Sequence, residues 1–422
     1  MITKVEINPS DIFTPRSSSV NERMYVHRPS LENSFSDSLA SGAHLLIYGE
    51  SGCGKSWLYK KYFATHSIYF EVANLANASR YDSIAHELQD IANRDSSNVL
   101  TGYKETKAAD AGVDFGLKIG TKIEHEKSYE SVQKDAFLDV LEVIRGRADE
   151  RRAFLVLDNL ERIYSKPKLM EELADLITLL DDSRYSTFNV KLLIVGVPSG
   201  VREYFSRTPT LTTIANRLRE LPEVSRLQHA ESSKLIEKGL FTELGLKISD
   251  QERQKLIDHI IWVTDGIPQK LHEYCLELSL LSLDMGSKLD LTLLAKSDAK
   301  WLKTSLSSSY SAVEMLMNER NTKIGRRNQV LFCLGILEQD EFKYSDVETI
   351  VRNEFPESTK DTTLNIPQVL SELADESQGV LKKAPKGDAY MFKDPMYRMC
   401  IRAMLKHNFG SDTVDKVDIK SI

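Results

Sequence analysis

The feature that most constrains this chain is the octapeptide at residues 49–56, Gly-Glu-Ser-Gly-Cys-Gly-Lys-Ser. It matches the pattern G-x-x-x-x-G-K-S at every fixed position. The apolar run at 44–48 before it predicts a buried strand, and residues 57–63 after it predict a helix. Strand, glycine-rich loop and helix form the setting in which this pattern binds phosphate. The sequence therefore predicts a phosphate-binding loop, or P-loop.

Each fixed position of this loop has a chemical role. Glycines let backbone N–H groups curl around phosphates, and the start of the following helix adds its dipole. Lys55 is expected to reach the β- and γ-phosphates, and the Ser56 hydroxyl to ligate Mg²⁺. We therefore expect ATP, or a close relative, and Mg²⁺ as cofactors. The loop residues expected to contact the nucleotide are Gly49, Glu50, Ser51, Gly52, Cys53, Gly54, Lys55, Ser56 and Trp57.

Strands and helices alternate through the first half of the chain, which predicts an α/β fold with a parallel sheet covered on both faces. Period-two alternation at 110–126 predicts an inserted hairpin, either a contact surface or a flap packed on its own domain. Further strands are expected at 67–72, 153–157, 191–197 and 219–221, and helices at 29–41, 81–94, 130–147 and 167–181.

The second half of the chain predicts helices. Residues 229–305 are expected to form a helical lid, and a serine-rich stretch at 307–311 a linker. Three helices and a small hairpin within 312–410 are typical of a winged helix. The polar first 25 residues are expected to wrap loosely over the next domain. The predicted domains are an ATPase core at 1–228, the lid, the winged helix and a flexible tail at 411–422.

Asp158 ends the strand at 153–157, where P-loop enzymes place a carboxylate that serves the metal. Ser56 and Asp158 are thus the expected metal residues. Asn159 follows directly and can orient a water molecule but cannot take its proton. Glu161 is the nearest candidate base, or else a solvated acid at the start of a helix. We expect slow hydrolysis for this reason.

Two further positions could contact the γ-phosphate. Ser199 follows the strand at 191–197 and either senses that phosphate or caps a helix. Arg217 lies just before the strand at 219–221, with Arg219 beside it. In ring-forming ATPases an arginine here reaches the nucleotide of a neighbouring subunit. The alternative is that Arg217 is a surface charge.

Taken in order, these motifs resemble the AAA+ superfamily over about residues 20–405, and most closely the branch of origin-recognition, transposition and STAND signalling ATPases. The resemblance implies the sheet order 5-1-4-3-2, a helical lid and a winged helix. It also implies that Arg28 lines the adenine pocket and that Pro268 and Lys270 open a nucleotide-sensing helix. The chain departs from the family twice, with Gln269 and Lys270 where relatives carry arginine, and with Asn159 where many carry glutamate.

Composition limits the class of protein and the cellular compartment that we expect. Hydrophobic residues make up 41% of the chain and the net charge is −7, as in ordinary globular proteins. The four cysteines are far apart in sequence, which argues against a disulfide framework or a zinc site. We find no apolar signal core and no run long enough for a membrane helix. We therefore expect a soluble, cytoplasmic protein without membrane contact.

The charge of the C-terminal region helps to choose between DNA binding and protein contact. Residues 310–422 hold 16 Lys and Arg against 18 Asp and Glu, a net of −2. The helix expected to enter a DNA groove, 366–376, carries acids and no basic residue. The leading hypothesis is therefore a nucleotide-dependent switch that controls a separate partner or effector protein, with nucleotide-dependent homo-oligomers. The alternatives are an initiator or transposition-type ATPase that assembles on DNA, and a structural ATP-binding subunit with negligible turnover.

Overall fold

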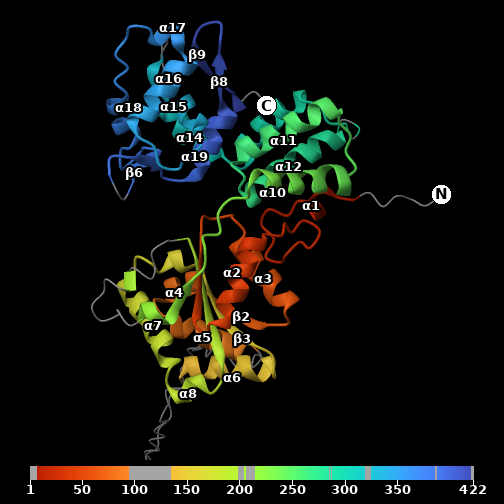
Figure 1. Cartoon of the computed structure of the whole chain (residues 1–422), viewed down its shortest axis with the longest axis vertical. Helices are drawn as coiled ribbons and strands as arrows, with labels where there is room; N and C mark the ends of the chain where they lie inside the picture. The colour runs from red at the N-terminus through yellow and green to blue at the C-terminus, as the bar shows by residue number, and fades with distance from the viewer. Residues whose placement is uncertain are drawn as a thin grey trace, which may run out of the picture. The chain divides into compact units, whose positions relative to one another are not determined.

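Figure 1 shows the computed structural model of the chain, whose described part falls into two compact units. One unit comprises Arg28–Ser51 and Lys55–Val224, and the other comprises Met1–His27, Gly52–Gly54 and Ser225–Ile422. We describe each unit by itself. The structure describes residues 7–94, 135–197, 204–205, 214–284, 286, 288–318, 325–384 and 387–419.

The first unit is built on a five-stranded parallel sheet in the order β2-β3-β4-β1-β5. Read from the other edge, this is the predicted order 5-1-4-3-2, so the predicted fold class is confirmed. Strands on both sides of β1 bring three strand ends to one edge of the sheet beside the P-loop. The strands are β1 His44–Tyr48, β2 Tyr69–Asn74, β3 Ala153–Asp158, β4 Val190–Gly196 and β5 Leu218–Glu220.

Both faces of the sheet are buried because its strands alternate between two apolar sets. On one face, Leu46, Leu157 and Ile194 lie in register and join the core formed with helices α4 to α7. On the other face, the Phe63 ring of α3 packs on Phe154, with ring centroids 5.0 Å apart. The helices of this unit are α2 Pro29–Ala40, α3 Lys55–Thr65, α4 Leu75–Tyr81, α5 Ile84–Asn93, α6 Ala136–Ala148, α7 Pro167–Leu179 and α8 Ser183–Ser186, with 3-10 turns η1 Leu160–Arg162 and η2 Ile214–Arg217.

The predicted insertion at 110–126 lies outside the described residues. The strands and most helices of this unit fall within a few residues of their predicted positions. Helix α4 was not predicted; it begins where the Asn74 side chain accepts the Ala76 N–H at 2.9 Å. None of the helices in the described ranges is long and apolar enough to cross a membrane.

The second unit contains the predicted lid helices and the N-terminal segment. The expectation that this segment wraps loosely over the following domain was wrong. Ile12 and Phe13 are fully buried in the core of the lid, and the N–H of Thr14 donates to Nδ1 of His272 at 3.0 Å. Burial lowers the pKa of His272 to about 4, so its ring stays neutral and accepts this bond. The elements here are α1 Pro9–Ile12, α10 His229–Ile236, the π-helix η3 Glu237–Glu243, α11 Asp250–Thr264, α12 Pro268–Asp284 and α13 Thr292–Thr304.

The remainder of this unit holds the predicted helices and hairpin of the C-terminal region, for which winged helix remains our interpretation. Its core is continuous with that of the lid, since Leu271 and Trp301 belong to the same buried cluster as Leu334 and Met404. The elements are α14 Ser307–Leu316, α15 Arg326–Ile336, α16 Tyr344–Glu354, α17 Pro356–Thr359, α18 Ile366–Leu373, β6 Leu381–Lys383, β7 Tyr390–Phe392, α19 Pro395–Met404, β8 Leu405–Asn408 and β9 Thr413–Lys416.

Two predictions in this region were wrong. The serine-rich stretch at 307–311 is not a linker but the start of α14, because Tyr310 and Val313 give that helix a buried face. The tail predicted to be flexible at 411–422 is held in place over residues 413–417. Its strand β9 pairs antiparallel with β8, and the hydroxyl of Tyr310 donates to the carbonyl oxygen of Val417 at 2.9 Å.

Candidate nucleotide site

The P-loop connects β1 to α3, and its shape depends on glycine. Gly49, Gly52 and Gly54 all have positive φ values, at 148°, 82° and 92°, which L-residues with a side chain rarely adopt. A Cβ atom at Gly49 would lie 2.3 Å from the carbonyl oxygen of Val224. Only glycine fits that position. Of the residues between these glycines, Cys53 is buried and Ser51 is exposed.

Lys55 begins α3, directly after the loop. Its Nζ donates hydrogen bonds to the carbonyl oxygens of Gly49 at 2.7 Å and Glu50 at 2.9 Å. The ammonium group is therefore held over the loop rather than extended into solvent. This is where a phosphate bound by the loop would meet a positive charge.

Ser56 and Asp158 come together although they are 102 residues apart in sequence. The Ser56 hydroxyl lies 3.5 Å from an Asp158 carboxylate oxygen. Burial raises the pKa of Asp158, against the opposing effect of the Asn159 N–H that it accepts at 2.8 Å. A half-buried carboxylate and a hydroxyl are hard oxygen ligands, and a divalent cation would stabilise the carboxylate charge. These residues fit a Mg²⁺ site.

Asn159 has a left-handed backbone, with φ at 66°. Its side-chain Nδ2 donates to Oδ1 of Asn74 at 2.8 Å. Asn74 ends β2 and lies in register with Asp158. The amide is thus anchored to the neighbouring strand. Sequence reasoning missed Asn74, although its place at the end of a strand beside β3 was a usable signal.

Glu161 lies in the short turn η1 after β3. Its Oε2 accepts the N–H of Val197 at 3.2 Å, which places the carboxylate where β4 ends. Since β3 and β4 are parallel neighbours, Glu161 and Asp158 lie at the same edge of the sheet. Ser199, the other candidate expected here, lies outside the described residues.

A second residue missed by sequence reasoning is Tyr59 of α3. Its hydroxyl is buried and has no hydrogen-bond partner among the described residues. Burial raises the pKa of Tyr59, and the charge of Asp158 raises it further. The ring therefore stays protonated and contributes an apolar wall beside the carboxylate. Its ring packs edge-on against Phe70 of β2, with centroids 5.8 Å apart.

The arginine expected to reach a neighbouring nucleotide is engaged within its own chain. Nε of Arg217 lies 2.5 Å from a carboxylate oxygen of Asp181. Arg219, on the edge strand β5, is exposed. Both interpretations of Arg217, a contact with a neighbouring nucleotide and a surface charge, stay predictions.

The remaining candidates occupy three other elements. Arg28 precedes α2, and its backbone N–H donates to the Glu32 carboxylate at 3.2 Å. Trp57 is half-buried in the first turn of α3. Pro268 begins α12, and Nζ of Lys270, in the first turn of that helix, lies 2.9 Å from a carboxylate oxygen of Glu273. Lys270 is thus held inside the lid.

A comparison with protein-family models finds one family that is similar to this part of the chain. The family model of the AAA domain matches residues 40–205, which span the P-loop, Asp158 and Glu161. This segment of the chain is thus similar to the AAA domain family. No curated protein matches the sequence.

Several solved structures are similar to this chain at low sequence identity. The Walker-type ATPase of Pyrococcus abyssi is 15% identical, with a TM-score of 0.50 over 90% of this chain and 96% of that chain. Cdc6p from Pyrobaculum aerophilum is 15% identical, with a TM-score of 0.43 over 93% and 96%. The Aeropyrum pernix ORC1 protein, solved with DNA, is 12% identical, with a TM-score of 0.45 over 94% and 96%.

Proposed function

We propose that this chain binds ATP with Mg²⁺, hydrolyses it slowly, and acts as a nucleotide-dependent switch for a separate partner protein. The observation that carries the proposal is the approach of Ser56 to Asp158 at 3.5 Å beside the Lys55 ammonium group. One cation and two oxygen ligands converge at the end of the P-loop. Bound Mg²⁺ would neutralise charge on the β- and γ-phosphate oxygens.

The slow rate follows from what surrounds Asp158. Asn159 cannot accept a proton, and its amide is already committed to Asn74. Glu161 is the acid we propose as the base, because its carboxylate is fixed at the ends of β3 and β4. Glu161 lies two residues further along the chain than Asn159, the residue that directly follows Asp158. A water molecule would have to be positioned by a less direct arrangement.

Isothermal titration with ATP and Mg²⁺ tests the nucleotide site. Lys55→Ala should lose measurable binding, because the β- and γ-phosphates would lack their cation in a preformed loop. Lys61→Ala, on the same helix but outside the P-loop, is the matched control and should bind like the wild type. Wild-type affinity in Lys55→Ala would remove the basis of the proposal.

For the C-terminal region we propose protein contact rather than the reading of a DNA sequence. Helix α18 contains Glu372, which forms an ion pair with Arg327 of α15. Lys382 and Lys383 of β6 are exposed, and Lys386 lies outside the described residues. Three phosphate contacts would give a log-log salt slope of only about −2.7 on duplex DNA.

Fluorescence anisotropy with random duplex DNA tests this assignment. We expect weak, sequence-independent binding at low salt that disappears near physiological salt, and a further loss in Lys382→Glu with Lys383→Glu. Tight binding that survives moderate salt would instead favour the alternative, an ATPase that assembles on DNA.

A further inference from the structure

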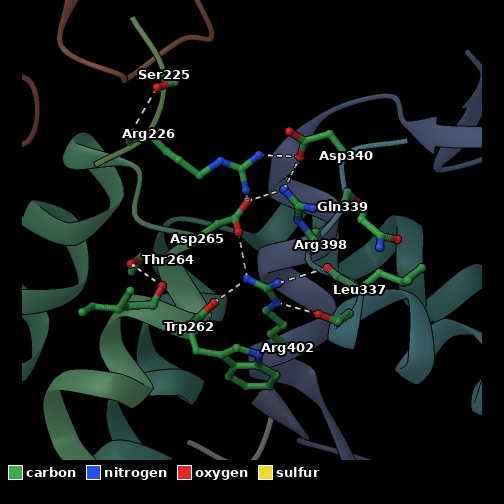
Figure 2. A network of polar contacts seen from close by, with 12 residues as sticks. Ser225, Arg226, Trp262, Thr264, Asp265, Leu337, Gln339, Asp340, Arg398 and Arg402 are labelled. Atoms are coloured by element: carbon green, nitrogen blue, oxygen red, sulfur yellow. Dashed lines mark hydrogen bonds and ion pairs between the residues drawn. The ribbon is translucent and has the colours of Figure 1, made fainter. Parts of the chain in front are cut away.

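A group of five charged side chains joins the lid to the C-terminal region (Figure 2). Asp265 lies at its centre, in the turn between α11 and α12, with about 8% of its side chain exposed. Its Oδ2 lies 2.8 Å from Arg226 and 2.5 Å from Arg398, and its Oδ1 lies 3.0 Å from Arg402. One carboxylate thus contacts three guanidinium groups.

These groups come from four separate parts of the second unit. Arg226 lies in the segment that leads into α10, and Asp265 directly follows α11. Asp340 lies between α15 and α16, where it pairs with Arg226 and, at 2.9 Å, with Arg398. Arg398 and Arg402 lie one turn apart on α19. We call these five residues the Asp265 cluster.

Helix α19 is held to the lid by more than charge. The guanidinium of Arg402 donates to the carbonyl oxygens of Trp262 at 2.6 Å and Gly335 at 2.6 Å, which belong to the lid and to α15 respectively. Its guanidinium also lies 5.4 Å from the centroid of the Trp262 ring. One side chain therefore binds both parts at once.

A second polar contact crosses the same boundary. Asp298 of α13 is almost fully buried and accepts from the Tyr274 hydroxyl at 2.7 Å, while His259 lies 2.9 Å away. Lys406, which directly follows α19 in β8, lies 3.5 Å from the other carboxylate oxygen. Around both contacts the apolar core continues without interruption from the lid into the C-terminal helices.

We propose that the lid and the C-terminal helical region are one rigid body, clamped at the Asp265 cluster. Asp265 is its positioning residue, since it directly precedes the Gly266-Ile267 turn into α12 and is bound from α19. On the proposed switch function, any movement of the lid caused by nucleotide is carried undiminished to the C-terminal region. This proposal excludes a switch in which the lid and the C-terminal region move relative to each other.

Distance measurements by pulsed electron paramagnetic resonance on the full chain test the clamp. Lys255→Cys in α11 and Asn353→Cys in α16 place spin labels at two exposed sites, one in each part, and the four native cysteines are buried. We expect the same mean and width of this distance without nucleotide, with ADP and with a nonhydrolysable ATP analogue. A nucleotide-dependent shift would overturn the clamp.

A third label separates the clamp from the switch. Asp175→Cys in α7 lies in the other unit, and its distance to residue 353 should change with nucleotide if the switch operates. A constant 175–353 distance would contradict the switch and leave the clamp standing. A constant 255–353 distance with a changing 175–353 distance supports both.

Substitution then tests whether the Asp265 cluster provides the rigidity. Asp265→Asn should broaden the 255–353 distance distribution and speed hydrogen exchange in both α19 and the α11–α12 turn. Asp258→Asn, which breaks an exposed ion pair with His229 inside the lid, is the control and should change neither. If Asp265→Asn does not fold, Asp340→Asn should give the same changes to a smaller degree. An unaltered distribution and unaltered exchange in a folded variant would refute the clamp.

Discussion

Replacing Asp265 by asparagine should cost about 3 kcal/mol of unfolding free energy. Removing one partner from a buried ion pair typically costs about 3–5 kcal/mol, because the other charge stays buried and unpaired. Arg398 and Arg402 are only 3% and 4% exposed. We take the lower end because asparagine keeps one acceptor oxygen, and because Arg402 retains its bonds to backbone carbonyls.

The matched variant is Arg226→Gln, which removes one guanidinium and leaves the other contacts of Asp265 in place. Arg226 is 23% exposed, so water can replace part of what it loses, and we expect about 1 kcal/mol. Urea unfolding followed by tryptophan fluorescence suits this unit, because Trp301 is fully buried in its core. Equal losses in the two variants, or a loss below about 1 kcal/mol in Asp265→Asn, would refute the assignment of Asp265 as the buried centre.

Three further outcomes are expected. Phosphate release should fall at least about tenfold in Glu161→Gln if Glu161 is the base. Arg162→Gln is the control and should release phosphate at the wild-type rate. A wild-type rate in Glu161→Gln would exclude Glu161 as the base. Sedimentation with a nonhydrolysable ATP analogue should show self-association that Arg219→Ala abolishes and Arg217→Ala does not, and a monomer in all states would exclude this contact. Burial alone would raise the pKa of Asp340, but bonds to Arg226 and Arg398 lower the pKa overall. The ionised Asp340 therefore stabilises the fold at pH values above its unfolded pKa. This stabilisation is lost as the pH falls through the lower pKa of the folded state. Urea titrations should therefore show the stability difference between wild type and Asp340→Asn holding constant above about pH 5 and shrinking below about pH 4; a difference independent of pH would contradict it.

The ATPase unit could be predicted closely because its signals are local. Short apolar runs mark β1, β3 and β4, and the P-loop directly follows β1. Asp158 was found from its place at the end of a strand. Asn74 was not, because its role depends on a strand pairing that no single segment encodes.

The errors share one physical cause. Composition predicts flexibility for serine-rich or polar segments, yet Tyr310 supplies a buried face to α14 and a hydrogen bond to the residue that follows β9. Phe13 likewise docks where Gly239 leaves room, since a Cβ there would lie 2.3 Å from the Phe13 ring. A few large side chains with partners far away in the sequence determine whether these segments are ordered. The average polarity of the segments gives no information about such contacts.

The Asp265 cluster also bears on why this unit uses charge where apolar side chains would serve. Well-packed apolar residues are often as stabilising as a buried ion pair or more so, so stability alone does not account for the arrangement. Apolar contacts are non-directional, whereas guanidinium and carboxylate groups must meet at fixed angles. A core continuous from lid to α19 would tolerate small rotations of one part against the other. The Asp265 cluster, with Arg402 bound to Trp262 and Gly335 at once, permits one arrangement, which is the property that a part transmitting motion requires.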